Sequence, residues 1–329
     1  MDFAAVLQDA LRASLGPLAA AYALAAIGLN LHFGYTGLLN FGQIAFLMAG
    51  AYGAAITVDQ GGSLWLGIGV GIAAAVALGL LFGLPTLRLR ADYLAIVTIA
   101  SGEVLRALIR SGDEDSLTGG VFGLAQFAGD FYDRSPFDDG FQIWGRFGYT
   151  ARGLWLVVVG WTLVALLTTV VSLLVSSPWG RVLRSIREDE DAARSLGKNV
   201  FGYKLQSLVI GGGIGAVAGI LTALDRDSVR PDSYLPVLTF AFYAVLILGG
   251  PATRLGPVVG AIVYWFLFEF TDRFLREAID AGWIPDDIIE PTDVGAVRFM
   301  LVGLGLMLLM IFRPQGILGK REEVLLDAR

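Results

Sequence analysis

Cysteine is absent from the 329-residue chain, and histidine occurs once, at His32. The lack of cysteine excludes disulfides, thiolate metal sites and a cysteine nucleophile. His32 has no second histidine or carboxylate at metal-ligand spacing, so we interpret it as a structural residue. The chain also lacks the Gly-x-x-x-x-Gly-Lys-Ser/Thr loop that binds nucleotide phosphates. Its net charge of −6 does not favour a nucleic-acid partner. We therefore expect no catalytic residue, metal site or cofactor in this chain.

Charged residues are also scarce, at 16% of the sequence against 55% hydrophobic residues, whereas a soluble domain has about 25% charged residues. The charges cluster between nine apolar segments, which span residues 15–33, 37–58, 63–84, 93–110, 153–175, 204–224, 235–250, 255–271 and 296–312. Segments of this length cross a bilayer as helices, because each backbone polar group must find its partner within the segment. We expect an all-α integral membrane protein, a polytopic bundle of about nine transmembrane helices. Many of the 43 glycines lie inside these runs and are expected to let helix backbones pack closely.

Basic residues predict which loops face the cytoplasm. The loops at 85–92, 176–203 and 251–254, with Lys204 and the tail from Arg313, hold 13 of the 24 basic residues. This side is expected to be cytoplasmic, with the N-terminus on the other face. The first 14 residues contain two aspartates and no positively charged start, which is not typical of a cleaved signal peptide. The sequence thus predicts one transmembrane domain over 1–329, with a cytoplasmic tail at 313–329, in a cell membrane.

The longest connection, residues 111–152, is expected outside the cell. Loops of this length are usually functional or disordered. Its aromatic side chains either cap the outer mouth of the bundle or rest at the membrane interface. They are Phe127, Phe131, Tyr132, Phe137, Phe141 and Trp144.

The cytoplasmic segment between residues 177 and 197 has the pattern of an amphipathic helix. Ser177 is suited to cap a helix with Pro178 in its first turn, and Gly197 is a stop signal. Apolar residues recur at helical spacing along one stripe. The stripe comprises Val182, Leu183, Ile186, Ala193 and Leu196. We expect this helix to lie along the cytoplasmic face, with Trp179 at the membrane surface.

Polar residues inside apolar runs indicate either a solute pathway or contacts between helices. Asn40 and Gln43 are three residues apart and share a helix face, so we assign them to the pathway and Asn30 to helix–helix contacts. Glu103 is also a pathway candidate, and an internal pair with Arg106, one turn on, is the alternative.

A glycine- and proline-containing stretch interrupts the apolar sequence near residue 250. Gly249, Gly250, Gly256 and Pro257 are expected to break the helix there. The break is either a tight cytoplasmic turn or a discontinuous helix whose end lines a cavity.

Six ordered stretches over roughly residues 20–320 resemble the branched-chain amino acid ABC transporter permease family, specifically its LivM-like branch. One of them, Asp191-Ala192-Ala193-x-x-x-Gly197, resembles the Glu-Ala-Ala-x-x-x-Gly loop that such permeases insert into a groove of the ATPase. The other five are residues 37–52, 87–98, 117–124, 248–261 and 312–316.

The resemblance implies a type II-like importer fold with a cytoplasmic coupling helix. It also implies a second permease subunit, two ATPase subunits that bind ATP and Mg, and an extracytoplasmic solute-binding protein. The implied coupling residues are Arg187, Glu190, Asp191, Ala192, Ala193, Leu196 and Gly197. The matching stretches add Tyr93, Thr98, Thr118, Gly119 and Gly120 to the pathway candidates.

We therefore expect an ABC importer permease that moves branched-chain amino acids or similar small polar solutes by alternating access. The chain itself is not expected to be an enzyme. An importer of urea or amides and an ATPase-independent transporter or channel are the alternatives. An integral membrane enzyme is disfavoured because no serine–histidine pair or metal–phosphate cluster is evident.

Overall fold

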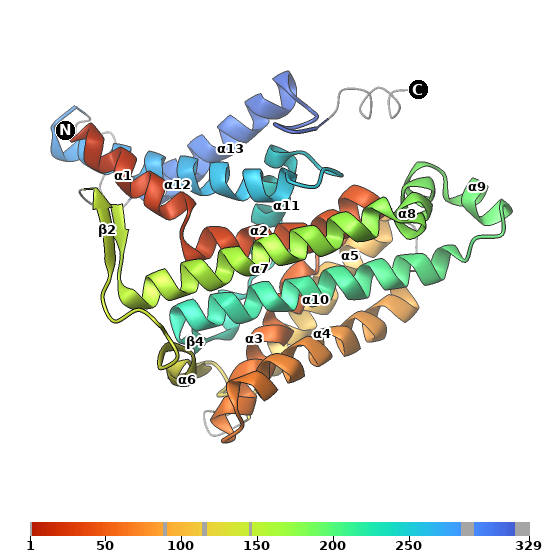
Figure 1. Ribbon diagram of the computed structural model, residues 1–329. Helices are drawn as coiled ribbons and strands as arrows, with labels where there is room; N and C mark the ends of the chain where they lie inside the picture. Colours follow the sequence, from red (N-terminus) through yellow and green to blue (C-terminus); the bar gives the residue numbers. More distant parts are fainter. Residues whose placement is uncertain (1, 88–90, 114–116, 145–146, 284–292, 320–329) are drawn as a thin grey trace.

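The nine apolar segments fold as long helices that pack side by side. The computed structural model describes residues 2–87, 91–113, 117–144, 147–283 and 293–319 (Figure 1). Residues 88–90, which belong to the family-like stretch 87–98, lie outside the described residues. The expected cytoplasmic tail is described only as far as residue 319. The nine elements are α2 (Pro17–Leu29), continued by the π-helix η1 (Asn30–Tyr35), then α3 (Gln43–Asp59), α4 (Leu64–Thr86), α5 (Ala91–Arg110), α7 (Ala151–Ser176), α10 (Val200–Arg226), α11 (Val237–Gly249), α12 (Gly256–Asp280) and α13 (Val294–Phe312).

Six helices in the described part of the chain are long and apolar enough to cross a membrane, and these include α4, α7, α10 and α13. The apolar helix α3 is shorter, at 17 residues. Helices α5 and α12 carry ionisable side chains towards their C-terminal ends, where Glu103 and Arg106 lie on α5 and Glu269 and Arg273 on α12. This arrangement confirms the expected polytopic all-α membrane fold.

Helix α10 is central and packs against α2, α3 and α4 (Figure 1). Glycines make these contacts possible, since a Cβ at Gly219 of α10 would lie 1.9 Å from the Leu47 carbonyl oxygen of α3. Likewise, a Cβ at Gly28 would lie 2.3 Å from the Gly211 oxygen. The expectation that glycine serves close backbone packing is confirmed at both contacts.

An N-terminal helix that the sequence analysis missed, α1 (Phe3–Ser14), lies against α12. Asp2 caps it by accepting a hydrogen bond from the Ala5 amide at 3.1 Å. The Phe3 and Phe274 rings lie 6.1 Å apart, and Arg273 reaches Asp9 at 3.6 Å. At 12 residues the helix is too short to span a bilayer, so the length of apolar runs did not predict it.

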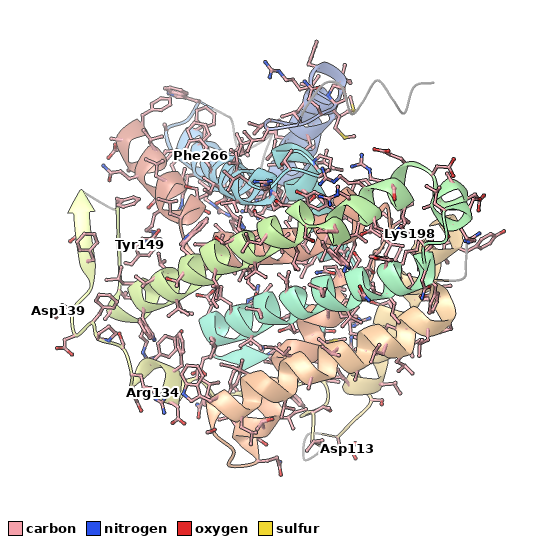
Figure 2. The ribbon with its side chains drawn as sticks, turned by 45° about the vertical axis from the view of Figure 1, so that its right-hand side comes forward. Asp113, Arg134, Asp139, Tyr149, Lys198 and Phe266 are labelled. Atoms are coloured by element: carbon pink, nitrogen blue, oxygen red, sulfur yellow. The ribbon has the colours of Figure 1, made fainter. Side chains whose placement is uncertain are left out.

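The two kinds of connecting segment lie at opposite ends of the bundle. Helices α8 (Pro178–Glu188) and α9 (Glu190–Ser195) lie at one end with the end of the described chain, while the N-terminus and α6 (Gly129–Tyr132) lie at the other (Figure 1). Figure 2 shows the same separation, with Lys198 at one end and Asp139 and Tyr149 at the other. The expected placement of the N-terminus opposite the 176–203 loop matches this arrangement.

The described residues of the 111–152 connection contribute to two small antiparallel sheets, of which one joins the connection to the segment after α10. Strand β1 (Leu124–Ala125) pairs with β4 (Ser228–Val229), and β2 (Phe141–Trp144) pairs with β3 (Phe147–Tyr149). The loop is also tied to the end of α10, because the Tyr132 hydroxyl donates to the Leu224 carbonyl at 2.8 Å.

The loop aromatics differ in how deeply they are buried. Phe127 is buried, and Phe131 and Phe137 lie 5.7 and 6.3 Å from the Trp155 ring, whereas Phe141 is exposed. The side chain of Trp144 lies outside the described part. Most of the described aromatics therefore pack as a cap on this end of the bundle.

Candidate functional site

The segment expected to couple to an ATPase consists of two short helices at one end of the bundle. Ser177 caps α8 by accepting from the Trp179 amide at 3.2 Å, and Pro178 occupies its first turn, as expected. The expectation of one continuous helix over 178–197 is wrong. Asp189 has an extended backbone and caps α9 by accepting from the Ala192 amide at 2.9 Å. Aspartate favours such cap positions over helix interiors, which explains the break.

The apolar stripe of this segment is buried only in part. Leu183, Ile186 and Ala193 are buried, but Leu196 is 79% exposed. The expectation that Leu196 shares the buried stripe is therefore wrong, because the break at Asp189 turns α9 relative to α8. Ala193 packs against Ile186 and Val200 of its own chain. The surface that α9 leaves open comprises Asp191, Ala192, Ser195 and Leu196.

One ion pair joins α9 to the base of α10, and two more lie within α9. Glu190 pairs with Lys204 of α10 and with Arg194 at 2.8 Å, and Arg194 also reaches Asp191 at 3.0 Å. Gly197 then turns the chain at a φ of 75°, a value that favours glycine. The helix-stop expectation at Gly197 is confirmed, since α9 ends at Ser195 and the chain turns there.

Arg187 connects α8 to the membrane helices. Its Nη1 donates to the carbonyl oxygen of Gly34 at 2.6 Å. Its side chain also lies over Gly37, where an added Cβ would be 3.2 Å from Arg187 Cγ. Gly34 belongs to η1, and π-helical turns leave backbone groups outside the usual ladder and are frequent at functional sites.

The π-helix η1 also holds two other parts of the bundle. Asn30 accepts from the Ala252 amide at 2.8 Å and donates to the Thr253 oxygen at 2.9 Å, which ties it to the turn between α11 and α12. The structure thus agrees with the interpretation of Asn30 as a contact between helices. His32 is fully buried, and its Nε2 lies 3.1 Å from the Leu208 carbonyl of α10. This contact agrees with a structural role for His32.

Asn40 and Gln43 lie inside the protein, next to His32. Asn40 is 1% exposed and Gln43 is fully buried. Asn40 Nδ2 donates to His32 Nδ1 at 3.1 Å and to Gln43 Oε1 at 3.3 Å, and Gln43 Nε2 donates to the Gly211 oxygen at 3.3 Å. In this conformation the pair forms a hydrogen-bonded joint between α2, α3 and α10, whereas the sequence favoured an open pathway for it.

Helix α5 supplies three more of the candidates. The Thr98 hydroxyl is buried and accepts from the Phe41 amide at 3.1 Å, so it belongs to the same interior joint. Tyr93 is 62% exposed and lies on an open face of α5 with Ile96 and Val104. Glu103 pairs with Arg106 at 2.7 Å, which is the alternative that the sequence left open.

The remaining pathway candidates shape a turn beyond α5. The Thr118 hydroxyl donates to the Ile109 oxygen at 3.0 Å. Gly119 and Gly120 are buried with φ values of 67° and 54°. A Cβ at Gly120 would lie 2.0 Å from the Gly112 oxygen, so these residues fold the loop back onto the end of α5.

The expected helix break near residue 250 is present. Helix α11 ends at Gly249, Gly250 has a φ of 107°, and α12 begins at Gly256 with Pro257 in its first turn. The two last carbonyls of α11 are not left open, because the Ile317 amide donates to Leu248 and the Leu318 amide to Gly249, each at 3.0 Å. The stretch after Phe312 therefore clasps the end of α11. Residues 248–261 and 312–316 both resemble the family in sequence, but neither stretch indicated that the two segments are in contact.

Comparison with known proteins identifies the family. The family model described as branched-chain amino acid transport system, permease component, matches residues 14–312. The permease protein LivM of a high-affinity branched-chain amino acid transport system from Escherichia coli K12 is 31% identical, over 90% of this chain and 67% of its own.

Other relatives match nearly end to end. The probable branched-chain amino acid permease LivM of Methanocaldococcus jannaschii is 25% identical over 92% of both chains. The permease LivH of Escherichia coli K12 is 25% identical over 93% of both chains. A solved inward-facing transporter, described as an ABC transporter of the metal-chelate type, gives a TM-score of 0.45 at 18% identity, over 94% of this chain and 88% of its own.

The family model covers the helix bundle, helices α8 and α9, and the break between α11 and α12. The chain belongs to the branched-chain amino acid transport permease family and is a multi-pass membrane permease subunit of an ABC importer.

Proposed function

We propose that this chain carries branched-chain amino acids inward, as one of two permease subunits that act with two ATPases. The observation that carries the solute class is the match over 90% of the chain to a permease of a high-affinity branched-chain amino acid system. The similarity to both LivM and LivH, two permeases of that kind of system, supports a heteromeric pair. An extracytoplasmic binding protein delivers the solute, and residues 1–329 act as a single permease domain.

ATP and Mg bind in the partner ATPases, and hydrolysis takes place there. The coupling surface is the open side of α9, where Asp191, Ala192 and Leu196 are exposed. Leu196, at 79% exposure, is a large apolar side chain on a charged segment, and we assign it to the contact with the ATPase groove. Ala193 supports this surface from beneath by packing α9 onto Ile186.

Motion of α8 and α9 reaches the membrane through Arg187. Its bond to the Gly34 oxygen pulls on η1, which is tied by Asn30 to the α11–α12 turn and by His32 to α10. A shift of this one element therefore acts on several helices at once. The two permease subunits rock against each other, and the solute passes between them by alternating access.

The first test is to purify the tagged chain in mild detergent and identify the chains that accompany it by mass spectrometry. The expected result is a second permease and ATPase subunits, with ATP hydrolysis that leucine-loaded binding protein stimulates. Recovery of the assembly with stimulation by urea or amides instead would overturn the solute class. Recovery of the chain alone from several detergents would overturn the proposed assembly.

A further inference from the structure

A cavity of about 430 Å³ opens at the end of the bundle that carries α8. It lies between the last residues of α7, the turn before α12 and the clasp that follows α13. Its polar lining includes Arg184 of α8 and Arg254 of the turn, and Val175, Leu255 and Leu318 add apolar surface. Pockets that bind small molecules have volumes of about 300–1,000 Å³, so the cavity is large enough for a phosphorylated headgroup.

Both arginines retain unused hydrogen-bond capacity. Arg184 donates through Nη2 to the Val175 oxygen at 2.8 Å and through Nε to the Gly180 oxygen at 3.4 Å. Arg254 donates through Nη2 to Ser176 Oγ at 2.9 Å. Within the described ranges neither guanidinium pairs with a carboxylate, and no acidic residue lines the cavity. Within the described residues, Arg184 Nη1 and the Nη1 and Nε of Arg254 make no hydrogen bond to the protein. Two guanidinium groups that are held in place in this way and keep free N–H donors can bind an anion through several charged hydrogen bonds.

The location of the cavity indicates which kind of anion it would bind. Helix α7 ends at Ser176, α11 ends at Gly249 and α12 begins at Gly256, so the cavity lies where three membrane helices meet the aqueous phase. The start of α12 adds its positive end beside Leu255. Basic pockets between transmembrane helices on the cytoplasmic side bind the headgroups of anionic lipids. The exposed apolar residues Leu255 and Leu318 at the rim suit the glycerol and acyl region.

We propose that this cavity binds the phosphate of an anionic phospholipid headgroup through Arg184 and Arg254. The bound lipid then bridges α8 of the coupling segment and the α11–α12 turn, the two elements that η1 also connects. The inference rests on the membrane location of the chain and is independent of which solute it carries.

The test measures lipid retention by native mass spectrometry on the full chain, purified with whatever subunits accompany it. The probes are phosphatidylglycerol, phosphatidylcholine with the same acyl chains, and inorganic phosphate. The expected result is retention of phosphatidylglycerol over phosphatidylcholine, reduced about tenfold by Arg184→Gln/Arg254→Gln, as the loss of charged hydrogen bonds predicts. Arg181→Gln, an exposed arginine one turn earlier on α8 and outside the cavity lining, should leave retention unchanged.

Arg184 also holds a backbone carbonyl of α7, so the double variant can lose stability for that reason alone. Arg254→Gln by itself removes only a bond to the Ser176 hydroxyl, and it should still lower retention several-fold at an unchanged melting temperature. Equal retention of the two lipids, or retention that survives both variants, would overturn the proposal. Displacement of the lipid by millimolar inorganic phosphate would assign the site to a soluble anion and overturn the lipid assignment.

Discussion

Arg187 Nη1 donates to the Gly34 carbonyl oxygen at 2.6 Å, and this bond joins α8 to the π-helix η1 that continues α2. The carbonyl belongs to the same six-residue turn as Asn30 and His32, each of which holds a different helix or turn. A charged donor on a backbone carbonyl is a strong and geometrically specific contact. The relationship therefore connects α8 directly to the helix contacts in the interior of the bundle.

Replacement of Arg187 should uncouple the transporter. In Arg187→Ala we expect solute uptake to fall about tenfold, within the range typical of coupling between two sites, while ATP hydrolysis persists. Arg187→Lys should retain part of the uptake, since lysine keeps the positive charge but lacks the planar guanidinium with its fixed N–H donors. Uptake and hydrolysis are measured on the same proteoliposomes. Arg181→Ala is the control, because Arg181 is exposed on the same helix, and equal losses in both variants would contradict this connection through Arg187.

The open side of α9 should decide assembly with the ATPase. Leu196→Asp is expected to weaken ATPase retention by about tenfold or more, because a carboxylate is costly to bury in an apolar contact. The melting temperature of the chain should not change, because Leu196 is 79% exposed. Co-purification at rising salt and detergent measures retention. Arg181→Ala, at an exposed position on α8 outside this surface, should retain the ATPase fully. Unaltered retention in Leu196→Asp would show that Leu196 does not lie in the interface.

Ala193 and Ala192 should respond differently to the same enlargement. Ala193→Leu inserts volume between α9 and Ile186, and overpacking of this kind costs about 1–3 kcal/mol. Ala192 is exposed, so Ala192→Leu should leave stability unchanged and act only on ATPase docking. Thermal melting of the purified chain, followed by co-purification, separates the two effects. A melting temperature lowered equally by both variants would contradict the assigned orientation of α9.

Replacement of Asn40 should lower the stability of the protein without changing solute recognition. Asn40→Leu removes the donor to His32 and Gln43 and leaves their acceptors unpaired, at a cost of about 1–3 kcal/mol for a buried polar group. We expect a lower melting temperature and an unchanged KM for uptake. A changed KM at an unchanged melting temperature would return Asn40 to the solute pathway that its sequence position suggested.

Two glycines on α10 give a matched test of helix packing. Gly219→Ala places a Cβ 1.9 Å from the Leu47 carbonyl, so the two backbones must separate, whereas Gly213→Ala meets no atom within 4 Å. The first should destabilise by about 1–3 kcal/mol, and the second should be neutral or stabilising by up to about 1 kcal/mol. Thermal melting in detergent measures both, and similar melting temperatures for the two variants would contradict the close contact of α3 with α10.

The sequence predicted the elements better than their contacts. Hydrophobic length located all nine long helices, and cap residues such as Ser177 and Gly197 correctly placed the limits of the coupling segment. The break at Asp189 was missed because helical periodicity continues across it. The burial of Asn40 and Gln43 was missed for another reason. A polar side chain in an apolar run has the same sequence signal whether it faces a neighbouring helix or a solute.

Contacts between distant segments had no signal in one sequence. The bonds from Arg187 to Gly34 and from residues 317 and 318 to the end of α11 join positions 153 and about 70 residues apart. Such pairs depend on how helices pack in three dimensions, which periodicity and caps do not specify.

ATP-driven uptake of radiolabelled leucine into proteoliposomes that hold the purified complex tests the central claim most directly. We predict uptake that requires ATP and the binding protein, that unlabelled isoleucine and valine compete away, and that Arg187→Ala reduces while hydrolysis continues. Uptake of leucine without ATP, or ATP-dependent uptake that branched-chain amino acids do not compete for, would contradict the account.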